Sequence, residues 1–467
     1  MASNPRLDWI DDFWEREILP SLAEYIRIPN KSVLFDPDWD EHGFMAEAVR
    51  HVTEWVDAQA VPGLTGTVHE LEGRTPVILL SIDGGAPGNV LIYGHLDKQP
   101  EFEGWLDHLG PWEPVLENER LYGRGGADDG YAIYSAIAAI KALQHDGAAF
   151  GRLSVLIECS EESGSPDLAS YMEALADEIG RPDLVVALDS TAGNYEQLWV
   201  TTSLRGMITG ELGVRVLHEG AHSGAAGGIV PSSFRLLRQL MSRIEDEHTG
   251  EILPDFLQAQ MPAMRDAEAA RAGEVLGDDF KTMFTYTGTS GPQSSDPKQV
   301  VIDNSWAASI EITGMDGVPP ISQAGNVLRP FTKVKFALRL PPTVKVAEAE
   351  AGLRDLLLGN PPNGVEVTLD LDTSSPGWHA PLTDADLEAS LQTASDAHFG
   401  APAIAIGCGG SIPFMEFLAN SFPDAQFVVT GVLGPHSNAH GPNEFLHVPT
   451  AKKLTACIAD VLSRFGS

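Results

Sequence analysis

The sequence is poor in cysteine, and it has no long uninterrupted apolar run. Its three cysteines, Cys159, Cys408 and Cys457, lie far apart and form no Cys-X-X-Cys pair, so neither a disulfide framework nor a thiolate zinc site is indicated. The longest candidate run, 131–140, ends at Lys141; it is too short to cross a bilayer and predicts a buried helix. No basic segment followed by an apolar one opens the sequence, so we expect a cytoplasmic protein.

Positive charge is also scarce. Lysine and arginine number 30 against 66 aspartates and glutamates, which leaves a formal net charge of −36 at pH 7. A field of that sign repels phosphate backbones and anionic membrane surfaces, so we expect no nucleic-acid partner and no membrane partner. The composition is otherwise ordinary, because 467 residues, 43% of them hydrophobic, suffice for about two or three globular domains with full cores.

Short β-rich runs alternate with helical stretches in the first and last parts of the sequence. The β-rich runs are nearly continuously apolar, which is typical of strands buried on both faces. The sequence therefore predicts an α/β domain whose mixed, largely parallel sheet is covered by helices on both faces. The predicted strands are 77–82, 90–93, 153–157, 184–188 and 427–432, and the predicted helices are 7–28, 45–58, 131–144 and 167–176.

The middle of the sequence has a different order of elements. It reads strand, helix, strand, strand, helix, strand, which is the ferredoxin-like order. We therefore predict a ferredoxin-like α+β domain over 204–374, inserted into a domain made of 1–203 and 375–467. A polar segment at about 250–300 interrupts it as a further insert. The six predicted elements are 206–217, 231–247, 305–314, 333–340, 344–357 and 365–371.

Ionisable side chains follow four of the predicted strands. In an open α/β sheet, ligands gather at the carboxyl ends of the strands. Imidazole and carboxylate donors without thiolates suit zinc, manganese or cobalt. The residues are His95 with Asp97, Glu161 with Glu162, Asp189, and His440, while Asp128 and Asp129 lie on a Gly-rich turn before the helix 131–144.

Each of these features alone has an ordinary structural explanation. A histidine after a strand is commonly structural, a Glu-Glu pair in a loop is commonly solvated, and Asp-Asp before a helix is commonly an N-cap. Their convergence at one edge of a sheet instead predicts a metal site. Five ligands from this set would exceed the need of one tetrahedral ion and would favour two ions with a shared carboxylate, an arrangement that suits hydrolysis.

Seven motifs occur in order along the chain: GHLD, LYGRGGADDG, SEESGS, ALDS, EGAHSG, GGSIP and SNAHGPNE. Together they resemble the di-metal dipeptidases and carboxypeptidases that include the carnosinases and the glutamate carboxypeptidases. The resemblance runs from about residue 8 to the C-terminus. It implies a metal-dependent exopeptidase that hydrolyses dipeptides or short peptides with a free C-terminal carboxylate, by means of a water held between two divalent metals.

The resemblance also implies which residues bind the metals. His95 and Asp189 are expected to bind one ion, Glu162 and His440 the other, and Asp128 both. Zinc is the expected metal, with manganese and cobalt as alternatives. The alternative histidine ligands are His379, His436 and His447, but the HGPNE context favours His440.

Catalytic roles follow from the same resemblance. Glu161 is expected to be the general base, which takes a proton from the water and passes it to the leaving amine; the alternative is a further metal ligand. Asp97 is expected to orient the imidazole of His95 through its other nitrogen. The peptide bond between Asp128 and Asp129 is expected to be cis, and Asp129 is the alternative bridge.

The resemblance implies substrate-binding residues in two places. One is the inserted domain, which is the expected lid and dimerisation domain, and the other is a loop near the end of the sequence. His222 is expected to stabilise the oxyanion, reaching the partner subunit's site across a homodimer. Asn326 and Arg339 are expected to hold the substrate carbonyl and its free carboxylate. A loop would receive the same carboxylate through backbone N–H groups; its residues are Gly409, Gly410 and Ser411.

Two other functions stay open. An N-acyl amino acid deacylase or amidase would use the same site and differ only in the pocket for the N-terminal half of the substrate. A catalytically silent dimeric metal-binding scaffold is of another class. The intact set of Glu161 and five candidate ligands argues against the scaffold.

Overall fold

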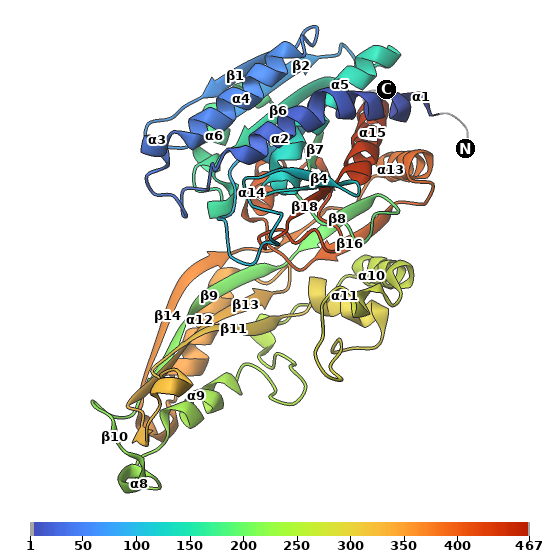
Figure 1. The fold of residues 1–467 in the computed structure, drawn as a ribbon. Helices are drawn as coiled ribbons and strands as arrows, with labels where there is room; N and C mark the ends of the chain where they lie inside the picture. The colour runs from blue at the N-terminus through green and yellow to red at the C-terminus, as the bar shows by residue number, and fades with distance from the viewer. Residues whose placement is uncertain (1–3, 466–467) are drawn as a thin grey trace.

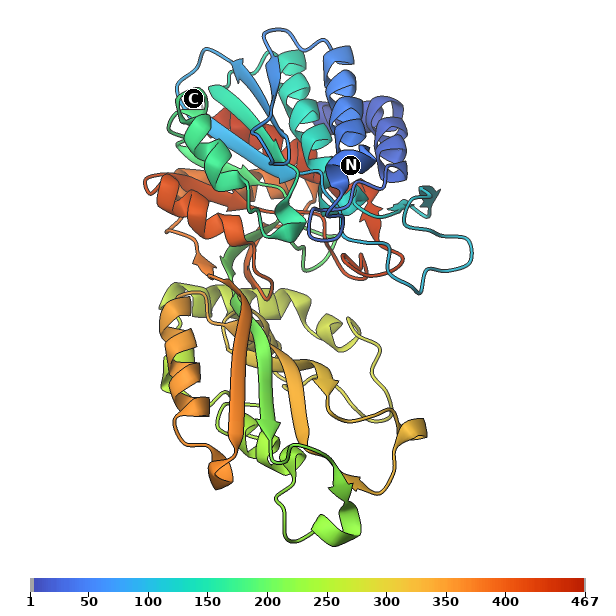
Figure 2. The ribbon, with the colours of Figure 1, turned by 90° about the vertical axis from the view of Figure 1, so that its left-hand side faces the viewer.

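The structure, a computed structural model, describes residues 4–465. It has two parts, which lie end to end in Figures 1 and 2. The upper part in Figure 1 contains a large mixed sheet with helices on both faces, and the lower part contains an elongated antiparallel sheet. Within residues 4–465, no helix is long and apolar enough to cross a membrane.

Nine strands form the large sheet, in the order β1-β2-β6-β3-β7-β17-β8-β15 with β16 paired to β8. β3 is parallel to both β6 and β7, β17 is parallel to β7, and β16 is parallel to β8. This mixed sheet confirms the predicted α/β class. The strands are β1 (Thr65–His69), β2 (Val77–Asp83), β3 (Asn89–His95), β6 (Arg152–Glu158), β7 (Leu184–Ala187), β8 (Trp199–Leu204), β15 (Trp378–His379), β16 (Ile404–Cys408) and β17 (Gln426–Val429).

Each face of the large sheet has its own core, because successive side chains of a strand point to opposite faces. Ile92 of β3 packs on one face, and Leu91 and Tyr93 pack on the other. The first face is covered by α1 (Pro5–Phe13), α2 (Leu19–Arg27), α4 (Phe44–Ala58), α5 (Tyr131–Asp146), α13 (Ala385–His398) and α15 (Val448–Phe465), and the second by α6 (Leu168–Ala174) and α14 (Pro413–Ser421).

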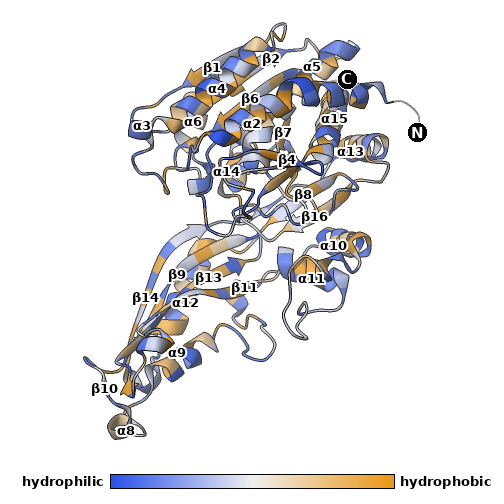
Figure 3. Cartoon of the chain, viewed as in Figure 1, coloured by the Kyte–Doolittle hydropathy of each residue, from blue (hydrophilic) through white to orange (hydrophobic). Residues whose placement is uncertain are grey.

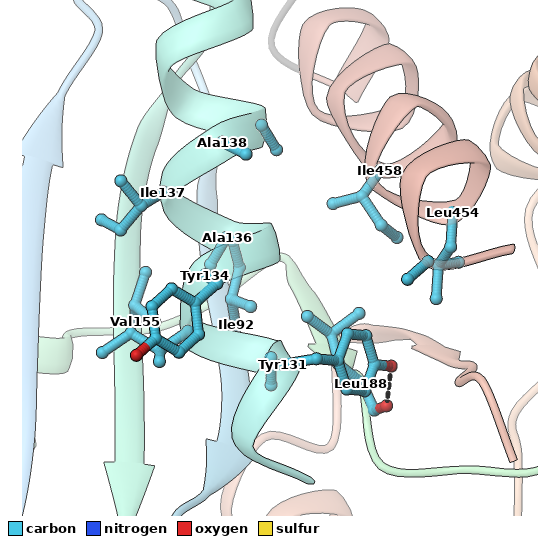
Figure 4. Close-up of a cluster of buried hydrophobic side chains, with 14 of the residues drawn as sticks. Ile92, Tyr131, Tyr134, Ala136, Ile137, Ala138, Val155, Leu188, Leu454 and Ile458 are labelled. Atoms are coloured by element: carbon cyan, nitrogen blue, oxygen red, sulfur yellow. Dashed lines mark hydrogen bonds between the residues drawn. The ribbon is translucent and has the colours of Figure 1, made fainter. Parts of the chain in front are cut away.

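Helix α5 is the most deeply buried of these helices, as its apolar sequence predicts. It lies between the sheet and α15, with Ile137 on the side of Val155 and Ala138 facing Ile458 (Figure 4). The hydroxyl of Tyr131, in its first turn, donates a hydrogen bond to the carbonyl of Leu188 (Figure 4). The start of α5 is thereby tied to the end of β7.

The predicted helix 7–28 is divided in the structure. One π-helical turn, Trp14–Ile18, separates α1 from α2. Pro20 lies in the first turn of α2 and has no N–H to continue a regular ladder of hydrogen bonds.

The lower part of the molecule has the predicted ferredoxin-like order of elements. Its sheet runs β14-β9-β13-β11, entirely antiparallel, and the apolar faces of α9 and α12 (Figure 3) pack against it. The chain leaves the large sheet after Leu204 and re-enters it at Trp378. The elements are β9 (Gly206–Arg215), α9 (Ser233–Met241), β11 (Ser309–Asp316), β13 (Phe331–Leu340), α12 (Val346–Leu358) and β14 (Glu366–Ser375).

The insert predicted at about 250–300 contains α10 (Ala263–Leu276) and the start of α11 (Pro297–Ser305). Its helices pack on the large sheet, where Ala272 and Leu276 of α10 share a small core with Trp199 and Ile404. Figure 1 shows α10 and α11 beside β8 and β16. Asp296 caps α11 and Pro297 starts it. The helix ends at residue 305, the first residue of the predicted strand 305–314, and the observed strand β11 begins later, at Ser309.

Candidate metal centre and substrate cavity

The structure brings the candidate ligands from the large sheet together at one edge. The carboxyl ends of β3, β6 and β7 meet there because these strands are parallel neighbours. Their side chains come from the end of β3 (His95), from a tight turn after β6 (Glu161–Ser163), from the loop after β7 (Asp189), from the turn before α5 (Gly126–Gly130) and from the loop after β17 (His440).

The ligand atoms form two groups that share Asp128. One group contains His95, Asp128 and Asp189, the other Asp128, Glu162 and His440, and within each group the atoms lie within 4.8 Å of one another. Nε2 of His95 is 3.4 Å from Oδ1 of Asp128, whereas Nε2 of His440 is 3.0 Å from Oδ2. Asp128 therefore presents one oxygen to each group, as a bridging carboxylate does.

The donor set fits two divalent cations. Nε2 of His95 is buried and makes no hydrogen bond within the described residues, although carboxylates surround it. Nδ1 of the same ring lies 3.1 Å from the carbonyl oxygen of Asp97, which places the proton on Nδ1 and leaves the Nε2 lone pair for a cation. Neutral imidazole and carboxylate oxygens are ligands that zinc and related metals accept.

Asp97 supports the centre with both its main chain and its side chain. Its carbonyl oxygen bonds the His95 ring, while its carboxylate Oδ1 is 3.5 Å from Nδ1 of His95. The carboxylate instead accepts the backbone N–H groups of Glu161 and Glu162, each at 3.0 Å. Asp97 thus orients the imidazole through its carbonyl and fixes the Glu161–Glu162 turn through its carboxylate.

Glu161 and Asp129 lie beside the two ligand groups and belong to neither among the described residues. Oε2 of Glu161 is 3.9 Å from Nε2 of His95. Oδ2 of Asp129 accepts the backbone N–H of His95 at 3.3 Å, which makes it a support for β3. The peptide bond between Asp128 and Asp129 is cis, as the resemblance implies.

Burial and crowding of like charges govern the electrostatics of the centre. Burial raises the pKa of Glu161 well above its ordinary value, and the charge of Asp189 adds to the effect. The pKa of Asp189 is itself raised by burial to about 7. At His440, desolvation alone would lower the pKa, but hydrogen bonds to Asp128 and Glu162 raise it to about 11. The His440 side chain is 55% exposed, so it forms the solvent-facing side of the centre.

Two residues implied to contact the substrate lie elsewhere. His222 ends the short strand β10 (Ala221–His222), which pairs with β12 (Val327–Leu328). The carbonyl of Asn326 accepts the N–H of Ser223 at 2.9 Å, so His222 and Asn326 are neighbours. Figure 1 shows β10 at the far end of the lower part. Within one chain, the structure does not bring this pair to the metal ligands.

The residues implied to bind the carboxylate do come together. Nη1 of Arg339 lies 3.3 Å from Oγ of Ser411. Arg339, Gly409 and Gly410 line a cavity of about 800 Å³. The cavity adjoins the centre, because its lining also includes Thr191, which follows Asp189 by two residues, and Asn438.

Several supporting residues were missed by the sequence analysis. Gln99 donates to Oε2 of Glu162 at 2.7 Å. Arg124 and Glu444 form a buried ion pair, and Arg124 also donates to the carbonyl of Gly441 at 2.8 Å. This pair joins the turn of Asp128 to the loop of His440. The only signal in the sequence was that these residues stand inside or beside the GHLD, GRGG and HGPNE motifs.

The chain is similar to known proteins in sequence and in fold. The model of peptidase family M20/M25/M40 matches residues 91–464. A cysteinylglycine-S-conjugate dipeptidase of Corynebacterium striatum is 25% identical over 90% of this chain and 91% of its own length. The structure resembles that of the dipeptidase Dug1p of Saccharomyces cerevisiae, which is 20% identical, with 99% of this chain and 98% of that chain covered. It also resembles that of human carnosine dipeptidase 1, which is 21% identical with the same coverage. The TM-score is 0.75 in both cases.

We predict that cation binding releases protons. His440, whose pKa is about 11, holds a proton at pH 7, and Asp189, whose pKa is about 7, is about half protonated. A cation must displace both protons. Titration with Zn²⁺ or Mn²⁺ in weak buffer with an indicator dye should therefore release at least about one proton per chain, and His440→Ala should release fewer. Stoichiometric binding of two ions without proton release would show that these residues are not the ligands.

Proposed function

The chain belongs to peptidase family M20/M25/M40, and we propose that it is a metal-dependent exopeptidase whose substrates are dipeptides or short peptides with a free C-terminal carboxylate. One observation carries the proposal: two ligand groups share Asp128 beside a cavity that holds Arg339 and the glycine loop. The centre offers a place for the scissile carbonyl, and the cavity a place for the terminal carboxylate. The Corynebacterium striatum relative, a dipeptidase by name, supports the dipeptide substrate.

We propose that His95 and Asp189 hold one ion, Glu162 and His440 the other, and Asp128 both, with zinc, or else manganese or cobalt, as the metal. Such ions polarise a carbonyl and lower the pKa of water. Glu161 takes the proton of the attacking water and returns it to the leaving amine. Its raised pKa suits both steps, and Asp97 holds its backbone in place.

At the other end of the substrate, we propose that Arg339 and the backbone N–H groups of Gly409, Gly410 and Ser411 hold the carboxylate. A guanidinium forms two parallel hydrogen bonds with a carboxylate, and this fixes the orientation of the substrate. The contact between Arg339 and Ser411 keeps the guanidinium beside the loop. A peptide whose terminal carboxylate is blocked therefore loses its anchor.

We further propose a homodimer in which residues 204–374 act as lid and dimerisation domain, and 1–203 with 375–467 as catalytic domain. His222 and Asn326 then enter the partner's site and bind the substrate carbonyl as its negative charge develops. Two large apolar side chains are exposed on the segments that carry His222 and Asn326, which supports this proposal because a protein–protein contact would remove them from water. Ile229 is 82% exposed and Ile321 96%.

A substrate panel tests the proposed function. Protein loaded with Zn²⁺, Mn²⁺ or Co²⁺ should leave dipeptide amides intact, because the cavity selects the free carboxylate. It should hydrolyse free dipeptides in preference to N-acetyl and N-succinyl amino acids, which carry the same carboxylate but lack the free amino group. The release of amino acids is followed by chromatography. Preferential cleavage of N-acyl amino acids would replace the peptidase with a deacylase, and inertness toward both groups would favour a silent scaffold.

The role of Glu161 predicts the behaviour of one variant. Glu161→Gln should lower kcat by at least about 10²-fold, since loss of a general base costs about that much. Metal content, measured by mass spectrometry, should stay at the wild-type level because Glu161 lies outside both ligand groups. Glu173→Gln, exposed on α6, is the matched control. Loss of a metal ion would make Glu161 a ligand, and normal turnover would remove it from catalysis.

The dimer predicts complementation between two inactive variants. His222→Ala and Glu161→Gln should each lose most activity alone. Mixed by unfolding and refolding or by co-expression, they form heterodimers in which one site has both an intact Glu161 and the partner's His222. Activity should then recover to roughly a quarter of the wild-type value, from the statistics of random pairing in a two-fold dimer. Absence of recovery, with heterodimers shown by differential tags, would place His222 outside the partner's site.

A further inference from the structure

The cavity beside the metal centre is bounded by a part of the chain to which the proposed function assigns no task. One side consists of the glycine loop and Arg339. Another part of its lining comes from the segment 276–301, at the end of α10 and the start of α11. This segment stays against the large sheet because Leu276 and Val301 are buried in the core that they share with Trp199 and Ile404.

The polar groups of the cavity favour a single negative charge. Although the chain has 66 acidic residues, no Asp or Glu lies among the described residues that line the cavity, whereas Arg205 and Arg339 both do. Arg205 is engaged with the protein: its Nε donates to the carbonyl of Gly409 at 3.1 Å, and its Nη1 to the carbonyl of Ala307 at 3.2 Å and to Oγ of Ser309 at 3.0 Å. It braces the glycine loop and leaves Arg339 for a ligand.

The wall formed by the insert is apolar and partly uncovered. Phe280 is buried, but Met283 is 44% exposed and Phe284 is 68% exposed, and all three line the cavity. Exposed side chains of this size gain free energy when a ligand removes them from water. The cavity thus pairs one guanidinium with a large apolar surface, which matches a carboxylate attached to an apolar group.

We propose that Phe280, Met283 and Phe284 bind the side chain of the substrate's C-terminal residue and select peptides that end in a large apolar residue. The inference rests on the proposed function. A carboxylate on Arg339 places the adjoining side chain inside the same cavity. A C-terminal glycine leaves Met283 and Phe284 in water, and a lysine brings a third cation beside Arg205 and Arg339.

Hydrolysis tests this selectivity with the metal-loaded, full-length protein. Alanyl-phenylalanine and alanyl-leucine should exceed alanyl-glycine in kcat/KM by at least about 10-fold, the discrimination that a filled apolar pocket provides, and alanyl-lysine should be the poorest. The double variant Met283→Ser/Phe284→Ser should lower the ratio of phenylalanine to glycine substrate by about 10-fold. Leu253→Ser is the control, because Leu253 is 47% exposed in the same insert and is outside the described cavity lining.

A binding measurement separates the two proposals. In calorimetry, hydrocinnamate should bind the metal-loaded protein at least about 10-fold more tightly than acetate, and the double variant should abolish the difference. Protein that cleaves no peptide but shows this binding difference would refute the peptidase and retain the apolar wall. Protein that cleaves dipeptides with an unchanged phenylalanine-to-glycine ratio in the double variant would retain the peptidase and overturn the wall.

Discussion

Repulsion among carboxylates at one edge of the large sheet is the constraint on which the rest of the structure depends. Asp97, Asp128 and Asp189 are buried there, and Glu161 and Glu162 are nearly so. Such a group of like charges is stable only with compensating cations, bound protons or hydrogen-bond donors. Asp97 meets this demand with two backbone N–H groups. The other four carboxylates have two imidazoles beside them, those of His95 and His440, so negative charge remains that divalent ions can compensate.

The fold meets this constraint by supporting each ligand from a different direction. Tyr131 ties the start of α5 to the residue before Asp189. The Arg124–Glu444 pair ties the turn of Asp128 to the loop of His440. Each tie joins segments far apart in the sequence, so the positions of the ligand atoms depend on the packing of the entire upper part. The buried position of α5, between the sheet and α15 (Figure 4), gives these ties a rigid base.

The lower part of the chain and the insert serve the centre in different ways. The lower part carries Arg339 on β13 of the ferredoxin-like sheet, where it lines the cavity, and His222 on the separate strand β10 at the far end (Figure 1). The insert is continuous in sequence with the lower part, yet it packs on the large sheet. The cavity is therefore lined by residues from both parts of the molecule, beside a centre whose candidate ligands come from only one.

By itself, the sequence determined the α/β class, the set of candidate ligands, the four strands of the lower sheet and five of the nine strands of the large sheet; β1, β8, β15 and β16 were not predicted. These follow from local signals: apolar runs specify buried strands, and polar residues at strand ends collect at one edge because neighbouring strands are parallel. Only the tertiary structure decided that Asp128 faces both ligand groups, that the carboxylate of Asp97 serves the Glu161–Glu162 turn, and that Phe284 faces the cavity of Arg339. These are contacts between segments tens to hundreds of residues apart, and no local pattern of hydropathy records which distant surface a side chain meets.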